Sequence, residues 1–267
     1  MNTLLEKIVE NKPLIHCLTN EVTETDCANI LLSIGASPIM STAHEEMNSI
    51  SKLSQAAVIN IGTPSNCLYD SQRKIVQNAK KNDVPIVLDP VGIGVSSFRK
   101  NHVKQLLNIS KPALVRCNLG ETQSLLGMDN LSPGIDSRQH LDWRKVKEIA
   151  IQMADELQTT VLITGANDVI ASQEKTCVIS GGTDLITKIT GGGDMLTAIC
   201  AALLSVTNSS FEAAKCAAYF WKVIGYLGSE KSSGLGDLHQ ELFNIAGDIT
   251  TIDGESHNVK IIEEVSR

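Results

Sequence analysis

Two kinds of hydrophobic pattern alternate along this chain. Short apolar runs rich in β-branched residues predict buried strands, and longer segments with apolar residues every three or four positions predict amphipathic helices. In the first two thirds of the sequence, strands are expected at residues 14–18, 37–40, 57–61, 86–88, 114–116 and 161–164. Helices are expected between them, at residues 26–34, 44–53, 68–81, 97–107 and 142–157. This alternation predicts an α/β fold whose mostly parallel sheet is covered by helices on both faces.

The pattern changes after residue 164. Short strands joined by Gly-containing turns are expected at residues 169–171, 176–179 and 185–189, and they predict an antiparallel extension of the sheet. A polar tail follows three further helices, which are expected at residues 194–206, 211–227 and 238–246. The segment 128–141 contains Pro133 and Gly134, and its length suits a surface insertion better than a domain boundary. We therefore expect residues 1–267 to form a single domain.

Composition excludes several classes of protein. With 267 residues, 42% of them hydrophobic, the chain can bury a sizeable core without disulfide or metal cross-links. Its 23 basic and 30 acidic residues give a formal net charge of −7, which argues against binding nucleic acid or an anionic membrane by bulk charge. Aromatic residues make up only 3%, too few for a base-stacking platform. Because the seven cysteines lack Cys-x-x-Cys spacing and no apolar run approaches a membrane span, we expect a cytoplasmic protein with reduced thiols.

The segment from Thr187 to Thr197 carries the strongest chemical signal. A predicted strand ends there, Gly191, Gly192 and Gly193 make a turn, and an apolar helix begins at or next to Asp194. Successive glycine N–H groups and the first turn of a helix can converge on one point and form an anion hole for a phosphoryl group. The loop is not a Walker A motif, because no Lys-Ser or Lys-Thr pair follows the glycines.

Asp194 permits two interpretations. It is either an N-cap, which contributes about 0.5–2 kcal/mol to helix stability, or a general base beside the anion hole. As a base it would take a proton from a hydroxyl that attacks the γ-phosphate of a nucleotide.

A second group of polar residues follows two predicted central strands. Asp89 ends one of them, and Arg116, Asn118 and Glu121 follow the next. At this edge of an α/β sheet, carboxylates can hold Mg²⁺ directly or through water. The alternative is structural: Asp89 belongs to a strand-end turn with Pro90, and Asn118 and Glu121 have the spacing of a capping box.

Further polar residues follow the strands near the N-terminus, in the segments from His16 to Thr23 and from Asn60 to Pro64. Met40, a soft apolar residue, either lines a small pocket or belongs to the core. His16 is interpreted as a buried, hydrogen-bonded histidine rather than a catalyst. The six histidines lack metal-site spacing, and no Gly-x-Ser-x-Gly sequence supports a serine hydrolase.

Together these segments resemble one family, the hydroxyethylthiazole kinases, in order and spacing. The resemblance runs from about Pro13 to the region of Gly234, and Gly-Ala-Ser-Pro-x-Met and Asp-Pro-Val-Gly are its most specific parts. The segments that carry it are Thr19-Asn20, Gly35-Ala-Ser-Pro-Ile-Met40, Asn60-Ile-Gly-Thr63, Leu88-Asp-Pro-Val-Gly92, Arg116 with Asn118 and Glu121, Thr164-Gly165, and Lys188-Ile-Thr-Gly-Gly-Gly-Asp194.

The resemblance implies a ribokinase-like fold with three layers, α/β/α. It also implies that ATP, with Mg²⁺, phosphorylates the hydroxyl of 4-methyl-5-(2-hydroxyethyl)thiazole, and that the thiazole phosphate serves thiamine biosynthesis or salvage. A homotrimer with its thiazole sites at subunit interfaces is implied as well.

The same resemblance implies roles residue by residue. Contact with ATP is implied for Arg116, Thr164 and Asn118, and organisation of Mg²⁺ and the phosphates for Asp89 and Glu121. The transferring phosphate would be received by the anion hole of Gly191, Gly192 and Gly193, with Asp194 as the base. Contact with the thiazole alcohol is implied for Met40, Gly191, Asn20, Gly62 and Thr63.

Two departures from the family pattern leave the substrate open. Most members carry Cys where this chain has Asp194, and an acid at this position is typical of sugar and pyridine kinases of the wider superfamily. The sequence Arg116-Cys-Asn-Leu-Gly-Glu121 also replaces a pattern with smaller residues. The alternatives are a pyridoxal or hydroxymethylpyrimidine kinase, a ribokinase-fold dehydratase of hydrated nicotinamide nucleotides, and a nucleotide-binding module without turnover.

Overall fold

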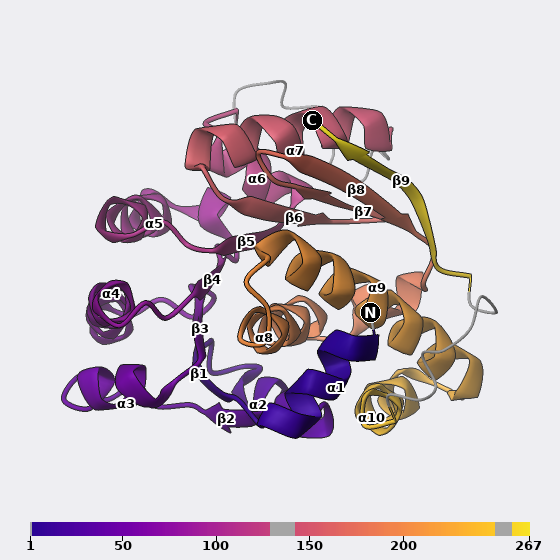
Figure 1. The fold of residues 1–267 in the computed structure, drawn as a ribbon, viewed down its shortest axis with the longest axis horizontal. Coiled ribbons are helices and arrows are strands. Elements are labelled where there is room, and N and C mark those ends of the chain that lie inside the picture. The colour runs from indigo at the N-terminus through magenta and orange to yellow at the C-terminus, as the bar shows by residue number, and fades with distance from the viewer. Residues whose placement is uncertain (1, 129–141, 249–257) are drawn as a thin grey trace.

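A computed structural model describes residues 2–128, 142–248 and 258–267 of the chain (Figure 1). Within these residues nine strands form a single sheet, in the order β2-β1-β3-β4-β5-β6-β7-β8-β9. The strands from β2 to β6 are parallel, whereas β7, β8 and β9 pair antiparallel. The strands are β1 (Leu14–Leu18), β2 (Ser37–Ile39), β3 (Ala56–Asn60), β4 (Ile86–Asp89), β5 (Leu114–Asn118), β6 (Thr160–Thr164), β7 (Asn167–Ala171), β8 (Lys175–Ser180) and β9 (Lys260–Ser266).

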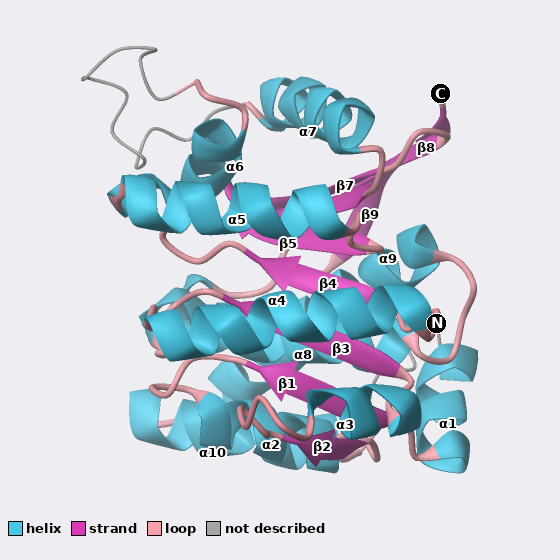
Figure 2. Ribbon diagram, turned by 90° about the vertical axis from the view of Figure 1, so that its left-hand side faces the viewer, coloured by secondary structure: helices cyan, strands magenta, loops and turns pink. Residues whose placement is uncertain are grey.

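Helices cover both faces of the sheet, and the predicted three-layer α/β/α arrangement is confirmed. One face carries α3, α4 and α5, with α6 and α7 toward the antiparallel end, and the other carries α8 and α9 with α1, α2 and α10 (Figures 1 and 2). The helices are α1 (Asn2–Asn11), α2 (Glu24–Ser33), α3 (Met47–Leu53), α4 (Asn66–Lys81), α5 (Ser97–Ile109), α6 (Leu119–Leu125), α7 (Trp143–Leu157), α8 (Gly192–Leu204), α9 (Ser210–Lys231) and α10 (Leu235–Ala246).

The core consists of two apolar clusters, one on each face of the sheet. Strand residues alternate between them, so that in β3 the side chain of Val58 belongs to one cluster and that of Ile59 to the other. Helix α8 is buried on all sides, because each of its residues from Met195 to Leu204 is buried. The start of this helix is therefore held firmly against the sheet.

The prediction of a strand at residues 185–189 is wrong. This segment forms the 3-10 helix η2 (Asp184–Lys188), in which short-range hydrogen bonds replace sheet pairing. The backbone N–H of Ile189, for example, donates to the carbonyl of Ile186 at 3.2 Å. The antiparallel extension itself is confirmed, but its third strand comes from another part of the chain.

That third strand, β9, lies in the segment predicted to be a polar tail. It pairs antiparallel with β8 at the edge of the sheet. Because the strand carries several charged residues, it has no hydrophobic pattern from which it could be predicted. Two of these side chains form ion pairs with helices: Glu263 with Lys147 of α7 at 2.5 Å and Glu264 with Lys215 of α9 at 3.0 Å. Helix α1 was also not predicted, and most of the insertion expected at 128–141 lies outside the described residues.

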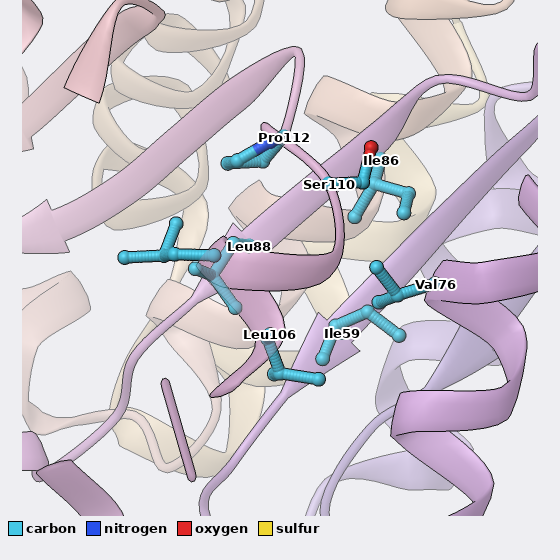
Figure 3. A pocket seen from close by; sticks show the side chains of 8 residues that line it. Ile59, Val76, Ile86, Leu88, Leu106, Ser110 and Pro112 are labelled. Atoms are coloured by element: carbon cyan, nitrogen blue, oxygen red, sulfur yellow. The ribbon is translucent and has the colours of Figure 1, made fainter. Parts of the chain in front are cut away.

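A small apolar pocket lies between the sheet and the helices α4 and α5 (Figure 3). Its volume of about 10 Å³ leaves room for about one water molecule, so it is a packing defect rather than a ligand site. No helix in the described part of the chain has both the length and the apolar character that crossing a membrane requires.

Candidate active site

A cleft of about 1300 Å³ lies at the carboxyl ends of β4, β5 and β6. This is the edge of an open α/β sheet at which ligands bind, and the volume suffices for a nucleotide and a small second substrate. Two groups of residues that the sequence placed far apart, the glycine loop and the polar ends of the central strands, meet in its wall. The predicted site residues that line it are Arg116, Asn118, Glu121, Thr164, Gly191, Gly192, Gly193 and Asp194.

The glycine turn opens α8 in the way that an anion hole requires. Gly191 is the N-cap with φ of +82°, and the helix begins at Gly192, two residues before Asp194. Within the described residues, the N–H groups of Gly193 and Asp194 in this first turn receive no hydrogen-bond partner. They are left to bind an anion, which the positive end of the helix dipole also favours.

Two of these glycines are required by close contacts. A Cβ on Gly193 would lie 2.4 Å from Nη1 of Arg116, and one on Gly191 would lie 2.6 Å from the Cγ2 methyl of Thr23. The guanidinium of Arg116 therefore packs directly against the glycine turn. It also donates from Nη2 to Oγ1 of Thr164 at 2.9 Å, so a cation is fixed beside the anion hole.

The carboxylate of Asp194 is held from behind by three neutral donors. Oδ2 accepts from Nδ2 of Asn20 at 2.8 Å and from Oγ1 of Thr23 at 2.6 Å, and Oδ1 accepts from Nδ2 of Asn60 at 2.8 Å. Because Gly191 is the N-cap and Asp194 bonds to these distant side chains, the N-cap interpretation of Asp194 is wrong. The carboxylate lines the cleft in a fixed orientation.

Asp89 is the most deeply buried acid of the site, with 0% exposure. Its Oδ2 accepts from Oγ1 of Thr197 at 2.6 Å and lies 3.6 Å from Nη1 of Arg116. Among the described residues, its Oδ1 has no hydrogen-bond partner. Burial raises the pKa of Asp89 to about 7, the nearby charges of Glu121 and Asp194 add to the rise, and Arg116 opposes it.

Asn118 and Glu121 form the capping box that their spacing predicts. The N–H of Glu121 donates to Oδ1 of Asn118 at 2.9 Å, and the N–H of Asn118 donates to Oε2 of Glu121 at 2.9 Å. The other oxygen of Glu121, Oε1, accepts from the N–H of Gly92 at 2.9 Å. Glu121 therefore fixes the loop after β4 while its carboxylate lines the cleft.

The acids of the site fit Mg²⁺ bound together with phosphates better than a metal held by protein alone. The described residues contain no group of three His, Cys, Asp or Glu side chains able to hold an ion. Asp89, however, offers a buried oxygen without a partner beside Glu121. Because Mg²⁺ uses one or two carboxylates plus substrate phosphates and water, this donor set suits it.

The remaining predicted residues divide into two groups. Gly62 donates its N–H to Oδ1 of Asn60 at 2.8 Å, and Thr63 accepts at Oγ1 from the N–H of Glu21 at 3.2 Å, so both lie beside the donors to Asp194. Met40 does not line the cleft; it is half-buried and packs against the core cluster that contains α8.

The structural interpretation of His16 is confirmed in part, because Nδ1 has no hydrogen-bond partner among the described residues. Its side chain is fully buried, and Nε2 lies 2.9 Å from the carbonyl of Ser41. Burial lowers the pKa of His16, so the ring is neutral at pH 7.

The sequence did not single out four residues that the structure brings into the site. Thr23 and Asn60 donate hydrogen bonds to Asp194, and in the sequence they belong to segments whose only signal is polar residues after a strand. Lys222 and Asp168 also line the cleft, with their charged groups 3.5 Å apart. Lys222 is one of three lysines in the long helix α9, and nothing in the sequence distinguishes it from the other two.

Comparison with known proteins identifies one family over nearly the full chain. The model of the hydroxyethylthiazole kinase family matches residues 5–251. The hydroxyethylthiazole kinase of Shouchella clausii is 36% identical over 264 residues, covering 98% of this chain and 100% of that protein. The enzyme of that name from Clostridium botulinum is 34% identical over 236 residues, 87% of this chain and 85% of the relative.

Solved structures extend the comparison to the fold. The hydroxyethylthiazole kinase protein of Pyrococcus horikoshii superposes with a TM-score of 0.88 at 30% identity, covering 98% of both chains. A ribokinase-like superfamily protein of Enterococcus faecalis matches with a TM-score of 0.67 at 12% identity, covering 93% of this chain and 95% of its own. The ribokinase-like fold that the motifs implied is confirmed.

Proposed function

This chain belongs to the hydroxyethylthiazole kinase family, and we propose that it transfers the γ-phosphoryl group of ATP to the hydroxyl of 4-methyl-5-(2-hydroxyethyl)thiazole. The product, a thiazole phosphate, would serve thiamine biosynthesis or salvage. One observation carries the proposal: a carboxylate, that of Asp194, lies in the first turn of a buried helix that opens on three glycines and faces a large cleft.

In the proposed reaction Asp194 is the general base. The substrate hydroxyl gives its proton to the carboxylate while its oxygen bonds to the γ-phosphorus. The bond from the γ-phosphorus to the oxygen that bridges it to the β-phosphate breaks, and ADP leaves with that oxygen. The N–H groups of Gly193 and Asp194 in the first turn of α8 would stabilise the charge on the transferring phosphoryl oxygens, whereas the N–H of Gly192 already donates to the carbonyl of Ile189 at 3.3 Å. Arg116, packed against Gly193, adds a positive charge next to them.

Asp89 and Glu121 would hold Mg²⁺ with the phosphates of ATP. When bound, the ion would neutralise charge on the β- and γ-phosphates. The oxygen of Asp89 that lacks a partner supports this role. Arg116, Thr164 and Asn118, which line the cleft, are the proposed contacts of the nucleotide.

Met40, Gly191, Asn20, Gly62 and Thr63 are the proposed contacts of the thiazole alcohol. We propose a homotrimer with this site at subunit interfaces, which fits the position of Met40 outside the cleft that one chain forms. All seven cysteines are free thiols, six of them buried, which supports a reducing compartment such as the cytoplasm.

The decisive experiment incubates the purified protein with ATP, Mg²⁺ and the thiazole alcohol and measures ADP and the mass of the product. We expect one ADP per thiazole phosphate. Pyridoxal and hydroxymethylpyrimidine are tested in parallel, because Asp194 stands where most family members carry Cys. If either alcohol is phosphorylated in preference to the thiazole alcohol, the protein is a kinase with a different substrate. Nucleotide-dependent dehydration of a hydrated nicotinamide nucleotide, without phosphorylation of any alcohol, would overturn the proposal.

A further inference from the structure

Thr23 occupies the N-cap position of α2 without capping that helix. Thr is a favoured N-cap because its hydroxyl can accept a hydrogen bond from the second or third N–H of the helix. Here the side chain makes no such bond. Two acceptors lie within reach of its single hydroxyl proton, Oδ1 of Asn20 at 3.2 Å and, across 171 positions of sequence, Oδ2 of Asp194 at 2.6 Å. The shorter contact assigns the proton to Asp194. Thr23, a residue suited to capping its own helix, thus donates a hydrogen bond to the candidate base instead.

The orientation of the other two donors to Asp194 is fixed by backbone groups. The N–H of Val22 donates to Oδ1 of Asn20 at 3.1 Å, and the N–H of Gly62 donates to Oδ1 of Asn60 at 2.8 Å. Since each amide oxygen is occupied in this way, each Nδ2 must face the carboxylate. Asn20, Thr23 and Asn60 therefore form a set of three donors matched to an ionised acid.

The distribution of these bonds leaves one part of the carboxylate free. An ionised carboxylate has about four acceptor positions. Oδ2 accepts two hydrogen bonds, from Asn20 and Thr23, whereas Oδ1 accepts only the one from Asn60. The remaining position is on Oδ1, and Asp194 lines the cleft whereas its three donors do not.

From these contacts, and resting on the proposed phosphoryl transfer, we propose that Thr23 is a positioning residue that holds Asp194 with its Oδ1 presented to the substrate hydroxyl. The methyl group of Thr23 packs against Gly191, since a Cβ there would lie 2.6 Å from it. The same side chain thus fixes the base through its hydroxyl and the glycine turn through its methyl group. Two conservative substitutions separate these contributions.

Thr23→Val keeps the shape of the side chain and removes the donor, whereas Thr23→Ser keeps the donor and removes the methyl group. We expect Thr23→Val to lower kcat about tenfold to a hundredfold, because a misplaced base loses its near-attack geometry. KM for ATP and the melting temperature should change little, the latter by no more than about 4 °C. Thr23→Ser should retain most of kcat. Equal kcat in Thr23→Val and wild type, or an equal loss in both variants, would overturn the proposal.

A double variant tests whether Thr23 acts through Asp194. In an Asp194→Ala background, Thr23→Val should lower kcat no further, because the group that it positions is gone. A further tenfold loss would contradict the proposed role.

A crystal structure of Thr23→Val supplies a readout that does not depend on the substrate. We expect the Asp194 carboxylate to leave the orientation set by Asn20 and Asn60, and an unchanged carboxylate would overturn the proposal. If wild-type protein phosphorylates no alcohol, the proposed function fails, while this structural result still decides whether Thr23 positions Asp194.

Discussion

Asp194 and Asp89 lie at the same edge of the sheet, yet the two carboxylates differ in burial and in hydrogen bonding. Asp194 faces the cleft and accepts hydrogen bonds from three neutral side chains. Asp89 is buried, keeps one oxygen without a partner, and has its pKa raised to about 7 by burial. The first arrangement suits an acid that is held in place to receive a proton, and the second suits an acid whose free oxygen binds a cation.

The largest expected effect comes from removing the base. Asp194→Ala should lower kcat by about 10²–10⁴-fold, the usual contribution of general base catalysis, while KM for ATP stays near the wild-type value. Steady-state ADP release measures both. The control is Asp70→Ala, which removes an exposed acid of α4, and it should match wild type. Unchanged turnover in Asp194→Ala would end its assignment as base.

The second test uses the pH dependence of stability. Because burial raises the pKa of Asp89 to about 7, native protein holds this proton over a pH range in which the unfolded chain has lost it. The stabilising contribution is therefore complete below about pH 4 and is lost as the pH rises to about 7. Between these limits, wild type should lose a few kcal/mol of unfolding free energy relative to Asp89→Asn, which does not titrate.

Urea unfolding of both proteins at several pH values, without ATP and Mg²⁺, measures this difference. A difference that stays constant from pH 4 to pH 8 would show that Asp89 is ionised throughout in the free protein. The contrast with Asp194 would then be one of geometry alone.

A third test concerns the cation. Asp89→Asn should lower kcat/KM for ATP about tenfold to a hundredfold at limiting Mg²⁺, because a neutral amide binds Mg²⁺ more weakly than a carboxylate does. Raising the Mg²⁺ concentration should recover part of the loss. If the two acids have the distinct roles described above, raising the Mg²⁺ concentration should not increase the activity of Asp194→Ala. Recovery of activity in both variants would contradict these distinct roles.

The smallest expected effect involves Asp168, another buried acid, which has the ammonium group of Lys222 beside it. Lys222 lies 3.5 Å from this carboxylate and donates to the carbonyls of Gly165, Ala166 and Gly181, which lie in two turns of the cleft wall. Lys222→Met should raise KM for ATP about fivefold, the equivalent of one hydrogen bond, and leave kcat near wild type. Initial rates measured over a range of ATP concentrations give both constants. A fivefold fall in kcat would contradict this prediction and indicate that Lys222 takes part in phosphoryl transfer.

Most strands and helices could be predicted from the sequence because the core is built from regular apolar patterns. The sequence failed where stability does not come from apolar burial. Strand β9 carries charged residues at an edge, and the segment 185–189 has a strand-like composition but is held by local hydrogen bonds in η2. Neither feature has a hydrophobic period from which it can be predicted.

The site was predictable where its residues are close in sequence. The capping box of Asn118 and Glu121 follows from spacing alone, and the glycine turn before Asp194 indicates an anion hole. The donors to Asp194 could not be found in this way. Thr23 and Asn60 are ordinary residues for a helix start and a strand end, and only the tertiary fold brings them to the carboxylate.

The burial of α8 has a consequence for how the site is lost on heating. A helix enclosed on every side cannot open locally, so its amide protons should exchange with solvent only when the whole molecule unfolds. Asp194, mounted in the first turn of that helix, keeps its geometry for as long as the domain stays folded. Thermal inactivation should therefore coincide with global unfolding rather than precede it.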